Sequence, residues 1–327
     1  MNLFLVTSPL QYICAEEALY SYRTNDNILV IVEQNEASGI KHLKNVFNED
    51  KWDTIIKVKS DQRTLTLPKI IKKINNLAGQ KGIEHFFFGE YKSFRTRLLM
   101  KNLTCKKFVF FDDGMATLFD YYDYIHEKRD FTRNRLIQDI ILRIQGCKPI
   151  GTMPFSDKLE IFTMFDIPDC VCKTTRNNLT IMRAAMKAHE CYSPSAPVGF
   201  IGEGAIGDKF GKREQPSKKE YLQQLIDFRA STESTIIYFP HRTETDDVKQ
   251  EVMKIDNLIY HNTELPLELE IATKKIKLSK ITGIASTALY TLSILYKEIP
   301  INAHKIDMLD VDRINSVIER HFEQRTI

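Results

Sequence analysis

The feature that most constrains the fold of this chain is a repeated order, in which a short apolar run precedes a stretch with helical periodicity. In the first third, apolar runs predict strands at 2–6, 28–32, 54–58, 85–88 and 108–111. Helical stretches lie between them at 11–22, 38–47, 67–77 and 93–101. Wholly apolar runs indicate strands buried on both faces, because a strand with one face in water alternates apolar and polar residues. Buried strands separated by helices predict a parallel sheet.

The same order returns near the start of the last 130 or so residues, at position 198. Strands are expected at 198–201, 235–239, 257–260, 277–281 and 299–302. Helices are expected at 217–228, 265–273, 286–296 and 311–322. Ser217 and Glu220 have the spacing of a capping box, which predicts that the first of these helices begins there.

The stretch from 120 to 195 interrupts this order. It holds a helical pattern at 133–143, and prolines at 149, 154 and 168 then break the pattern. A chain of 327 residues suits two α/β domains. We expect an N-terminal Rossmann-like domain at 1–150, a linker at 151–195 and a C-terminal Rossmann-like domain at 196–327. This layout is the GT-B type, in which two parallel sheets face each other across a cleft.

Composition excludes several classes of protein. Lys and Arg number 46 against 43 Asp and Glu, a balance too even for a dedicated nucleic-acid binder. No apolar run approaches the length of a transmembrane helix, and the N-terminus predicts a strand, not a secretory signal. The six cysteines lack the C-x-x-C spacing of a zinc or redox pair, so reduced thiols are expected. We therefore predict a cytoplasmic protein, with any contact with the inner membrane being peripheral.

Two adjacent carboxylates follow the strand expected at 108–111. Asp112 and Asp113 are costly to ionise together beside a buried strand, so one of them is expected to have a raised pKa and to suit a general base. Gly114 permits the tight turn that would present them. The alternative is an Asp-Gly turn that caps a helix.

A histidine and an arginine follow the strand expected at 235–239. In the sequence Pro240-His241-Arg242, Arg242 offers a bidentate fork and His241 a donor or a proton, which together suit an anion. The alternative is a surface turn with incidental cations.

Two further loops in the second half contain groups that suit a nucleotide. Ser286 and Thr287 open a helix, where hydroxyls and free N–H groups bind phosphate, although capping is the commoner role of such residues. The loop from Gly202 and Glu203 to Asp208 contains three glycines that allow close approach to a ligand. Its spacing is not the G-x-G-x-x-G of a dinucleotide site, so NAD binding is not predicted.

Together these motifs resemble those of bacterial sialyltransferases. Asp112-Asp113-Gly114, Pro240-His241-Arg242 and Ser286-Thr287 are similar to the D/E-D/E-G, His-Pro-type and Ser-Ser/Thr motifs of that group. The opening Val6-Thr7-Ser8-Pro9-Leu10-Gln11 is similar to the start of glycosyltransferase family 52 and polysialyltransferase-like sequences. Residues 125–197 contribute little to the resemblance, and the His-Pro order is not kept at His241.

The resemblance implies a GT-B fold, a CMP-sialic acid donor, inversion at the anomeric carbon and no required metal or cofactor. It implies that Asp112 or Asp113 is the catalytic base and that His241 stabilises the CMP phosphate. In some members the base is an acid in the loop that opens the second half, where Glu203 and Asp208 are the nearest candidates. The implied donor-binding residues are Gly202, Glu203, Asp208, Pro240, Arg242, Ser286 and Thr287, and those on the acceptor side are Ser8, Pro9, Gln11 and Gly114.

Several functions compete at this point. The first is sialyl transfer to a galactose-type or sialyl acceptor on a bacterial surface glycan, with a lipid-linked acceptor and a homodimer left open. The second is transfer from another nucleotide sugar, such as a UDP-hexose; the others are a nucleotide-sugar epimerase or hydrolase and a non-catalytic glycan-binding protein. The one D-x-D spacing, at 310–312, is expected to cap the last helix instead of holding a metal.

Overall fold

The computed structural model describes residues 1–33, 47–61, 63–204, 206, 209–210, 213–214, 216–284, 286–304 and 312–323. The chain divides into two compact units, Met1–Ile181 and Met182–Ile327. The helix expected at 38–47 lies outside the described residues except for its last position, and Asp208 lies outside them entirely.

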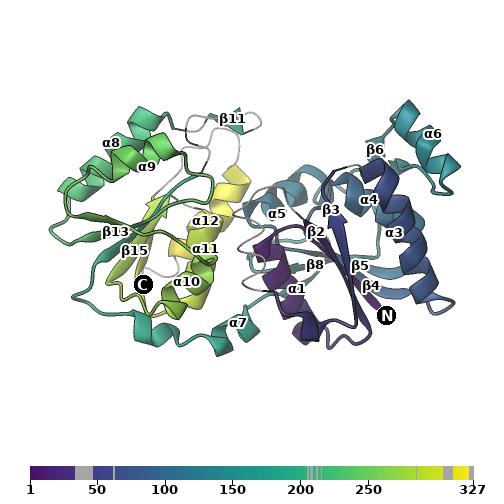
Figure 1. Cartoon of the computed structure of the whole chain (residues 1–327), viewed down its shortest axis with the longest axis horizontal. Coiled ribbons are helices and arrows are strands. Elements are labelled where there is room, and N and C mark those ends of the chain that lie inside the picture. The colour runs from purple at the N-terminus through teal and green to yellow at the C-terminus, as the bar shows by residue number, and fades with distance from the viewer. Residues whose placement is uncertain are drawn as a thin grey trace. The chain divides into compact units, whose positions relative to one another are not determined.

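The first unit is built on a seven-stranded sheet in the order β3-β2-β1-β4-β5-β8-β9. Every neighbouring pair in it is parallel. Its strands are β1 (Asn2–Val6), β2 (Asn27–Glu33), β3 (Thr54–Lys59), β4 (Ile83–Phe88), β5 (Cys105–Phe111), β8 (Leu159–Thr163) and β9 (Lys173–Arg176). Helices α1 (Pro9–Ser21), α3 (Arg63–Ala78), α4 (Phe94–Asn102) and α5 (Met115–Asp120) follow β1, β3, β4 and β5 (Figure 1).

Aromatic side chains fill the centre of this sheet. The rings of Phe4 on β1 and Phe87 on β4 stack with centroids 4.3 Å apart, and Phe88 on β4 stacks on Phe110 on β5 at 5.9 Å. All four side chains are fully buried. The wholly apolar runs in the sequence are therefore central strands, as predicted from their lack of alternation.

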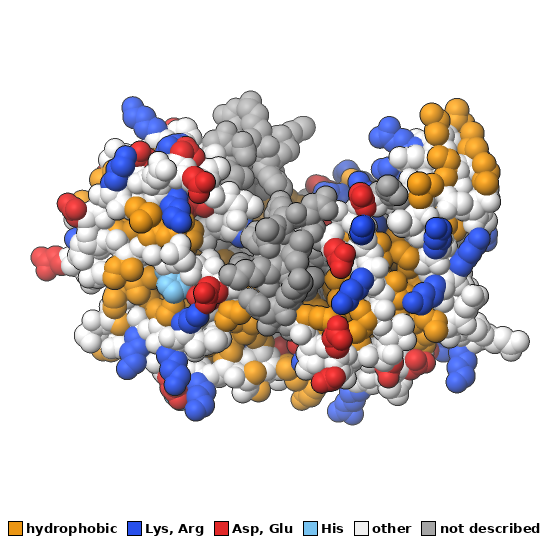
Figure 2. All heavy atoms as spheres, in the orientation of Figure 1, with side chains coloured by type: hydrophobic (Ala, Val, Ile, Leu, Met, Phe, Trp, Pro, Cys, Tyr) orange, Lys and Arg blue, Asp and Glu red, His pale blue; other side chains and the backbone are white. Residues whose placement is uncertain are grey.

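A small excursion separates β5 from β8. It comprises the π-helical turn η2 (Tyr121–Ile125), a two-stranded antiparallel ribbon of β6 (Phe131–Arg133) and β7 (Gly151–Met153), and helix α6 (Leu136–Ile144) between these two strands. Figure 1 shows α6 standing away from the sheet of its own unit. Figure 2 shows apolar side chains gathered over α6 at the surface.

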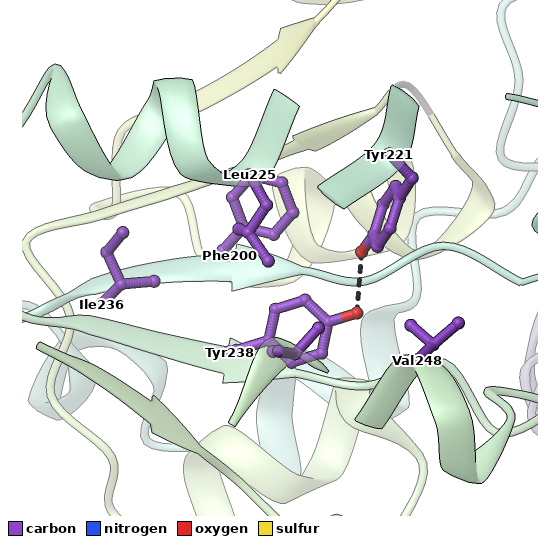
Figure 3. Close-up of a cluster of buried hydrophobic side chains, with 7 residues drawn as sticks. Phe200, Tyr221, Leu225, Ile236, Tyr238 and Val248 are labelled. Atoms are coloured by element: carbon purple, nitrogen blue, oxygen red, sulfur yellow. Dashed lines mark hydrogen bonds between the residues drawn. The ribbon is translucent and has the colours of Figure 1, made fainter. Parts of the chain in front are cut away.

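The second unit is built on a five-stranded parallel sheet in the order β14-β13-β10-β15-β16. Its strands are β10 (Val198–Ile201), β13 (Ile236–Phe239), β14 (Leu258–Tyr260), β15 (Lys280–Ile284) and β16 (Ile301–His304). Its helices are α8 (Lys218–Ala230), α9 (Asp246–Val252), α10 (Leu267–Thr273), α11 (Thr287–Leu295) and α12 (Asp312–Glu323). A buried cluster that includes Phe200, Leu225 and Tyr238 packs α8 against β10 and β13 (Figure 3).

Local signals placed most of these elements correctly. Ser217 and Glu220 form the predicted capping box, in which the Glu220 N–H donates to Ser217 Oγ and the Ser217 N–H donates to Glu220 Oε2. One strand begins later than expected, at Lys280 and not at 277, because Leu278 instead forms an isolated bridge with Tyr192. The prediction of an α/β protein with two Rossmann-like domains and parallel sheets is confirmed.

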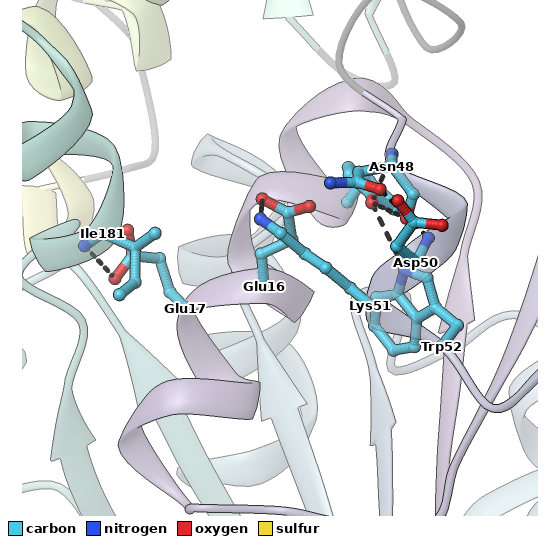
Figure 4. Close-up of polar contacts among 8 residues, drawn as sticks. Glu16, Glu17, Asn48, Asp50, Lys51, Trp52 and Ile181 are labelled. Atoms are coloured by element: carbon cyan, nitrogen blue, oxygen red, sulfur yellow. Dashed lines mark hydrogen bonds and ion pairs between the residues drawn. The ribbon is translucent and has the colours of Figure 1, made fainter.

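The stretch expected as a linker is largely part of the first unit. Strands β8 and β9 lie within 151–195 but pair in the first sheet, and the boundary between the units falls at 181/182. Helix α7 (Thr180–Ala185) begins against α1, where the Ile181 N–H donates to Glu17 Oε2 at 3.1 Å (Figure 4). Of the prolines that suggested a linker, Pro149 and Pro154 lie in the loops on either side of β7, and Pro168 lies between β8 and β9. No helix among the described residues is both long and apolar enough to cross a membrane.

Asp112 joins the ends of β5 and β8. Its side chain is fully buried and accepts hydrogen bonds from Thr163 Oγ1 and from the Met164 N–H, both at 2.6 Å. This carboxylate therefore fixes the position of the strand that follows the excursion.

Replacing Asp112 with alanine should destabilise the protein. Because the Met164 N–H would stay buried without its acceptor, we expect a loss of about 1–3 kcal/mol in the free energy of unfolding. Urea denaturation followed by circular dichroism measures it. Asp61→Ala, at an exposed position, is the control and should change the free energy by about 0.5 kcal/mol or less, as is usual away from such contacts. Equal losses of unfolding free energy in the two variants would contradict a role for Asp112 in holding the end of β8.

Candidate functional site

Each sheet has a point where its strand order reverses. In the first unit this point lies between β1 and β4, and in the second between β10 and β15. In open α/β sheets, ligands bind beyond the carboxyl ends of the strands at such a point. The described candidates all follow strands of the two sheets. In the first unit, Ser8, Pro9 and Gln11 follow β1, and Asp112, Asp113 and Gly114 follow β5. In the second unit, Gly202 and Glu203 follow β10, Pro240, His241 and Arg242 follow β13, and Ser286 and Thr287 follow β15.

The acceptor-side candidates meet around the start of α1. Ser8 caps this helix by accepting from the Gln11 N–H at 3.2 Å, and its hydroxyl donates to Asp113 Oδ1 at 3.4 Å. Pro9 occupies the first turn of α1, where its missing N–H is not needed. Gln11 is fully buried, and its Oε1 accepts from the Thr7 N–H at 2.9 Å. The structure thus brings Ser8, Gln11 and Asp113 together.

The two adjacent aspartates have different environments. Asp112 points inward and is held by β8, whereas Asp113 is only half-buried and faces Ser8. Gly114 separates their turn from α5 with φ +66° and ψ −145°, a conformation that is open essentially to glycine alone. The glycine therefore lets the backbone turn so that the two side chains diverge.

Both carboxyl groups have raised pKa values. Burial raises the pKa of Asp112 to about 7, against the lowering effect of its hydrogen bonds from Thr163 and Met164. Burial also raises the pKa of Asp113 to about 6, with the nearby carboxylates of Glu90 and Asp120 adding to the rise and Gln11 and Ser8 opposing it. Asp113 is the one with access to solvent, so it has both the proton affinity and the exposure that a general base needs.

Glu90 is a site residue that sequence reasoning missed. It follows β4 after Gly89, and its Oε1 accepts from Thr7 Oγ1 at 3.1 Å. At Gly89 a Cβ atom would lie 2.7 Å from Cγ and Cδ of Gln11, so the close approach of β4 to α1 requires glycine. The sequence did contain a signal for Glu90, because Gly89-Glu90 directly follows an apolar run, as Asp112-Asp113 does.

In the second unit, the loops after β10 and β13 lie against each other. A Cβ atom at Gly204 would lie 2.4 Å from Nδ1 of His241 and 2.5 Å from Cε1, so glycine is needed there for the imidazole to keep its place. The Thr243 N–H donates to Nδ1 of His241 at 3.2 Å. Thr243 Oγ1 also lies 2.8 Å from Nδ1. In the neutral tautomer that accepts at Nδ1, the proton is on Nε2, which is then a hydrogen-bond donor.

His241 is neutral near pH 7. Partial burial of the ring and the adjacent positive charge of Arg242 both lower its pKa. The residue as a whole is exposed. A neutral Nε2–H group donates a hydrogen bond to an anion without contributing a charge.

Glu203 is an acid whose buried oxygen lacks a partner. Its Oε2 is buried and has no hydrogen-bond partner in the described part of the chain, and burial raises its pKa to about 7. The Glu203 N–H donates to Tyr221 Oη at 3.4 Å. Gly202 also packs closely, since a Cβ atom there would lie 2.5 Å from Tyr238 Oη.

A buried chain of hydroxyls supports both loops, and sequence reasoning missed it. Tyr221 Oη and Tyr238 Oη are 2.7 Å apart (Figure 3). Tyr238 in turn donates to Glu244 Oε2. Tyr260 donates to the other oxygen of Glu244 at 2.7 Å, and the Glu244 N–H donates to the His241 carbonyl at 2.9 Å. This chain links the Glu203 backbone to the His241 backbone. No local pattern could have revealed it, because its members come from α8, β13, the following loop and β14.

Ser286 is the N-cap of α11, since its Oγ accepts from the Leu289 N–H at 3.4 Å, and Thr287 is the first residue of that helix. Gly283 and Ile284 lie beyond the end of the strand expected at 277–281, but they belong to β15 and pair with Ala303 and His304 of β16. Pro240 is half-buried and Arg242 is exposed. Among the described residues, no three His, Cys, Asp or Glu side chains gather as metal ligands would.

Comparison with known proteins is informative at the level of the fold. No protein-family model and no curated protein sequence matches the chain. A sialyltransferase from Photobacterium damsela is similar in structure over 98% of this chain and 79% of that one, with a TM-score of 0.51 and 13% identity. The chain has the GT-B fold. At 13% identity this similarity shows the fold alone and does not identify the donor or the acceptor.

Two other solved structures resemble the GT-B chain more weakly. A family 9 glycosyl transferase from Veillonella parvula covers 99% of this chain and 95% of its own, with a TM-score of 0.42 and 12% identity. MurG from Acinetobacter baumannii covers 98% of this chain and 81% of its own, with a TM-score of 0.44 and 9% identity.

Replacing Gly204 with alanine should weaken nucleotide binding, because the new methyl group would displace the His241 ring. We expect the affinity for CMP, the nucleotide that the motif resemblance implies, to fall by about tenfold or more, which is the loss of one hydrogen bond to a charged group. Isothermal titration calorimetry measures it.

The control is a double-mutant cycle. In a His241→Ala background, Gly204→Ala should have little further effect, because the ring it displaces is gone. Additive losses of CMP affinity in the double variant would show that Gly204 affects binding by a route other than the position of the His241 ring.

Proposed function

We propose that this chain is an inverting glycosyltransferase that moves sialic acid from CMP-sialic acid to a galactose-type or sialyl acceptor on a bacterial surface glycan, such as lipooligosaccharide or capsule. The observation that carries the proposal is that each unit has a strand-end site with a group suited to the reaction. The first unit holds a half-buried acid with a raised pKa, Asp113, and the second an exposed histidine with a lowered pKa, His241.

Asp113 is the base in this proposal, and Asp112 supports the strand beside it. The Asp113 carboxylate takes the proton from an acceptor hydroxyl while that oxygen attacks the anomeric carbon of the donor. Ser8, which donates to Asp113 Oδ1, orients the carboxylate. The new glycosidic bond forms as the bond to the CMP phosphate oxygen breaks, and attack from the opposite face inverts the anomeric carbon.

His241 and its neighbours take up the charge that develops on the leaving phosphate. The Nε2–H of His241, the guanidinium of Arg242 and the start of α11 at Ser286 and Thr287 are the groups we assign to this task. CMP leaves with a single phosphate, whose charge such donors are able to balance, so the proposal requires no metal. Gly202 and Gly204 let this loop pack closely against Tyr238 and His241, which keeps the imidazole in its place.

The first test is turnover of CMP-sialic acid with galactose-terminated acceptors, with and without EDTA. We expect acceptor-dependent CMP release that EDTA leaves unchanged. Asp113→Asn should lower kcat by about 10²–10⁴ with CMP affinity retained, as for loss of a general base. His241→Ala should lower the rate by about 10² or more and also weaken CMP binding.

The matched controls are Asp61→Asn and His189→Ala, which replace exposed residues outside both sites and should keep wild-type turnover. Turnover of a UDP-hexose in place of CMP-sialic acid would show that the enzyme uses a different nucleotide-sugar donor. CMP release without an acceptor would favour a hydrolase, and wild-type activity in Asp113→Asn would remove Asp113 as the base.

The pH profile separates the two candidate bases. A base works in its ionised form, so kcat/KM should rise as pH increases through the pKa of the base and level off above it. With Asp113 as the base, the rise is centred near pH 6; with Glu203, it is centred near pH 7. Glu203→Gln should leave the limb near pH 6 in place, whereas a limb near pH 7 that disappears in that variant would assign the base to Glu203.

A further inference from the structure

Helix α6 exposes an unusually apolar face. Leu136, Ile137, Ile140 and Ile144 have exposed fractions of 77%, 74%, 46% and 81%, respectively, although each is a large aliphatic residue. Their spacing places them along one side of the helix, with positions 136, 140 and 144 one turn apart. Only Leu142 of this nine-residue helix is buried. Large aliphatic side chains gathered in this way mark an interaction surface.

The helix is firmly held, so the exposure is not a result of loose packing. Gln145 Nε2 donates to the Thr64 carbonyl of α3 at 3.2 Å. Asn102, at the end of α4, donates to the Lys148 carbonyl at 2.9 Å and accepts from the Lys148 N–H at 2.7 Å. These contacts leave the outer face of α6 pointing away from its own unit (Figure 1).

The charge around this face is positive. Between residues 133 and 148 there are four basic residues and one acid. The acid, Asp139, accepts from the Arg135 N–H at 3.1 Å at the start of the helix. Arg135, Arg143 and Lys148 are exposed, and Lys72 of α3 extends toward the end of α6, where its Nζ lies 4.0 Å from the Cβ position of Gly146. Figure 2 shows blue side chains of Lys and Arg beside the orange side chains of α6.

We propose that the apolar face of α6 and its basic flanks form a docking surface for an anionic lipid membrane. Aliphatic side chains that enter the lipid boundary, with Lys and Arg beside them at the headgroups, are the pattern of a helix lying in a membrane interface. The helix contains no aromatic residue, whereas the centres of protein interfaces are enriched in aromatic residues. Such docking brings the first unit to lipid-linked acceptors, whatever the donor sugar.

Vesicle co-sedimentation of the full chain tests the proposal. The protein should pellet with phosphatidylcholine vesicles that contain phosphatidylglycerol, pellet much less with phosphatidylcholine alone, and be released by high salt. Ile137→Ser/Ile144→Ser should lower the partition coefficient by about tenfold or more, since two aliphatic side chains no longer enter the lipid. Arg135→Glu/Arg143→Glu should abolish the preference for anionic vesicles.

The control is Ile226→Ser, which removes an exposed isoleucine from α8 of the other unit and should bind vesicles as the wild type does. Equal vesicle binding by Ile137→Ser/Ile144→Ser and wild type would overturn the proposal. A dimer in analytical ultracentrifugation that becomes a monomer in that variant would also overturn it, because the face would then bind a second copy. Vesicle binding needs no turnover, so failure here is distinguishable from failure of the proposed transferase activity.

Discussion

Parallel pairing on both sides of β1 and on both sides of β10 is the constraint on which the rest of the structure depends. β1 lies between β2 and β4, and β10 between β13 and β15, so the carboxyl ends of these strands meet at one edge of each sheet. Chain segments that are far apart in sequence then leave the sheet side by side. This is how Ser8 reaches Asp113 across 105 positions and how Gly204 packs against His241.

Burial then gives chemically similar groups different roles. Asp112 and Asp113 are adjacent and identical in type, yet one turn at Gly114 directs Asp112 toward the end of β8 and leaves Asp113 beside Ser8. In the second unit, the chain of Tyr221, Tyr238 and Glu244 holds two loops whose own sequences contain little to fix them. In both units, buried hydrogen bonds to a carboxylate hold the segments next to the candidate groups, and such bonds are costly to break.

Much of the fold could be predicted from local signals. Apolar runs located β1 to β5 of the first sheet and all five strands of the second, and the capping box located the start of α8, because both signals depend on residues a few positions apart. The assignment of 151–195 to a linker shows the limit of this approach, since the short strands β8 and β9 acquire their place only by pairing with a sheet built earlier in the chain. Glu90 and the tyrosine chain were missed for the same reason, as their partners are distant in sequence.

The sequence by itself determined the alternation of strands and helices, the parallel character of the sheets and the loops in which chemistry was to be sought. These properties depend on hydrophobic periodicity and on glycine, proline and capping residues, which act locally. Only the tertiary structure decided which of two neighbouring aspartates is accessible, that His241 packs against Gly204 and Thr243, and that the apolar side of α6 is left uncovered. Those properties depend on burial and on partners brought together by packing, which no short stretch of sequence records.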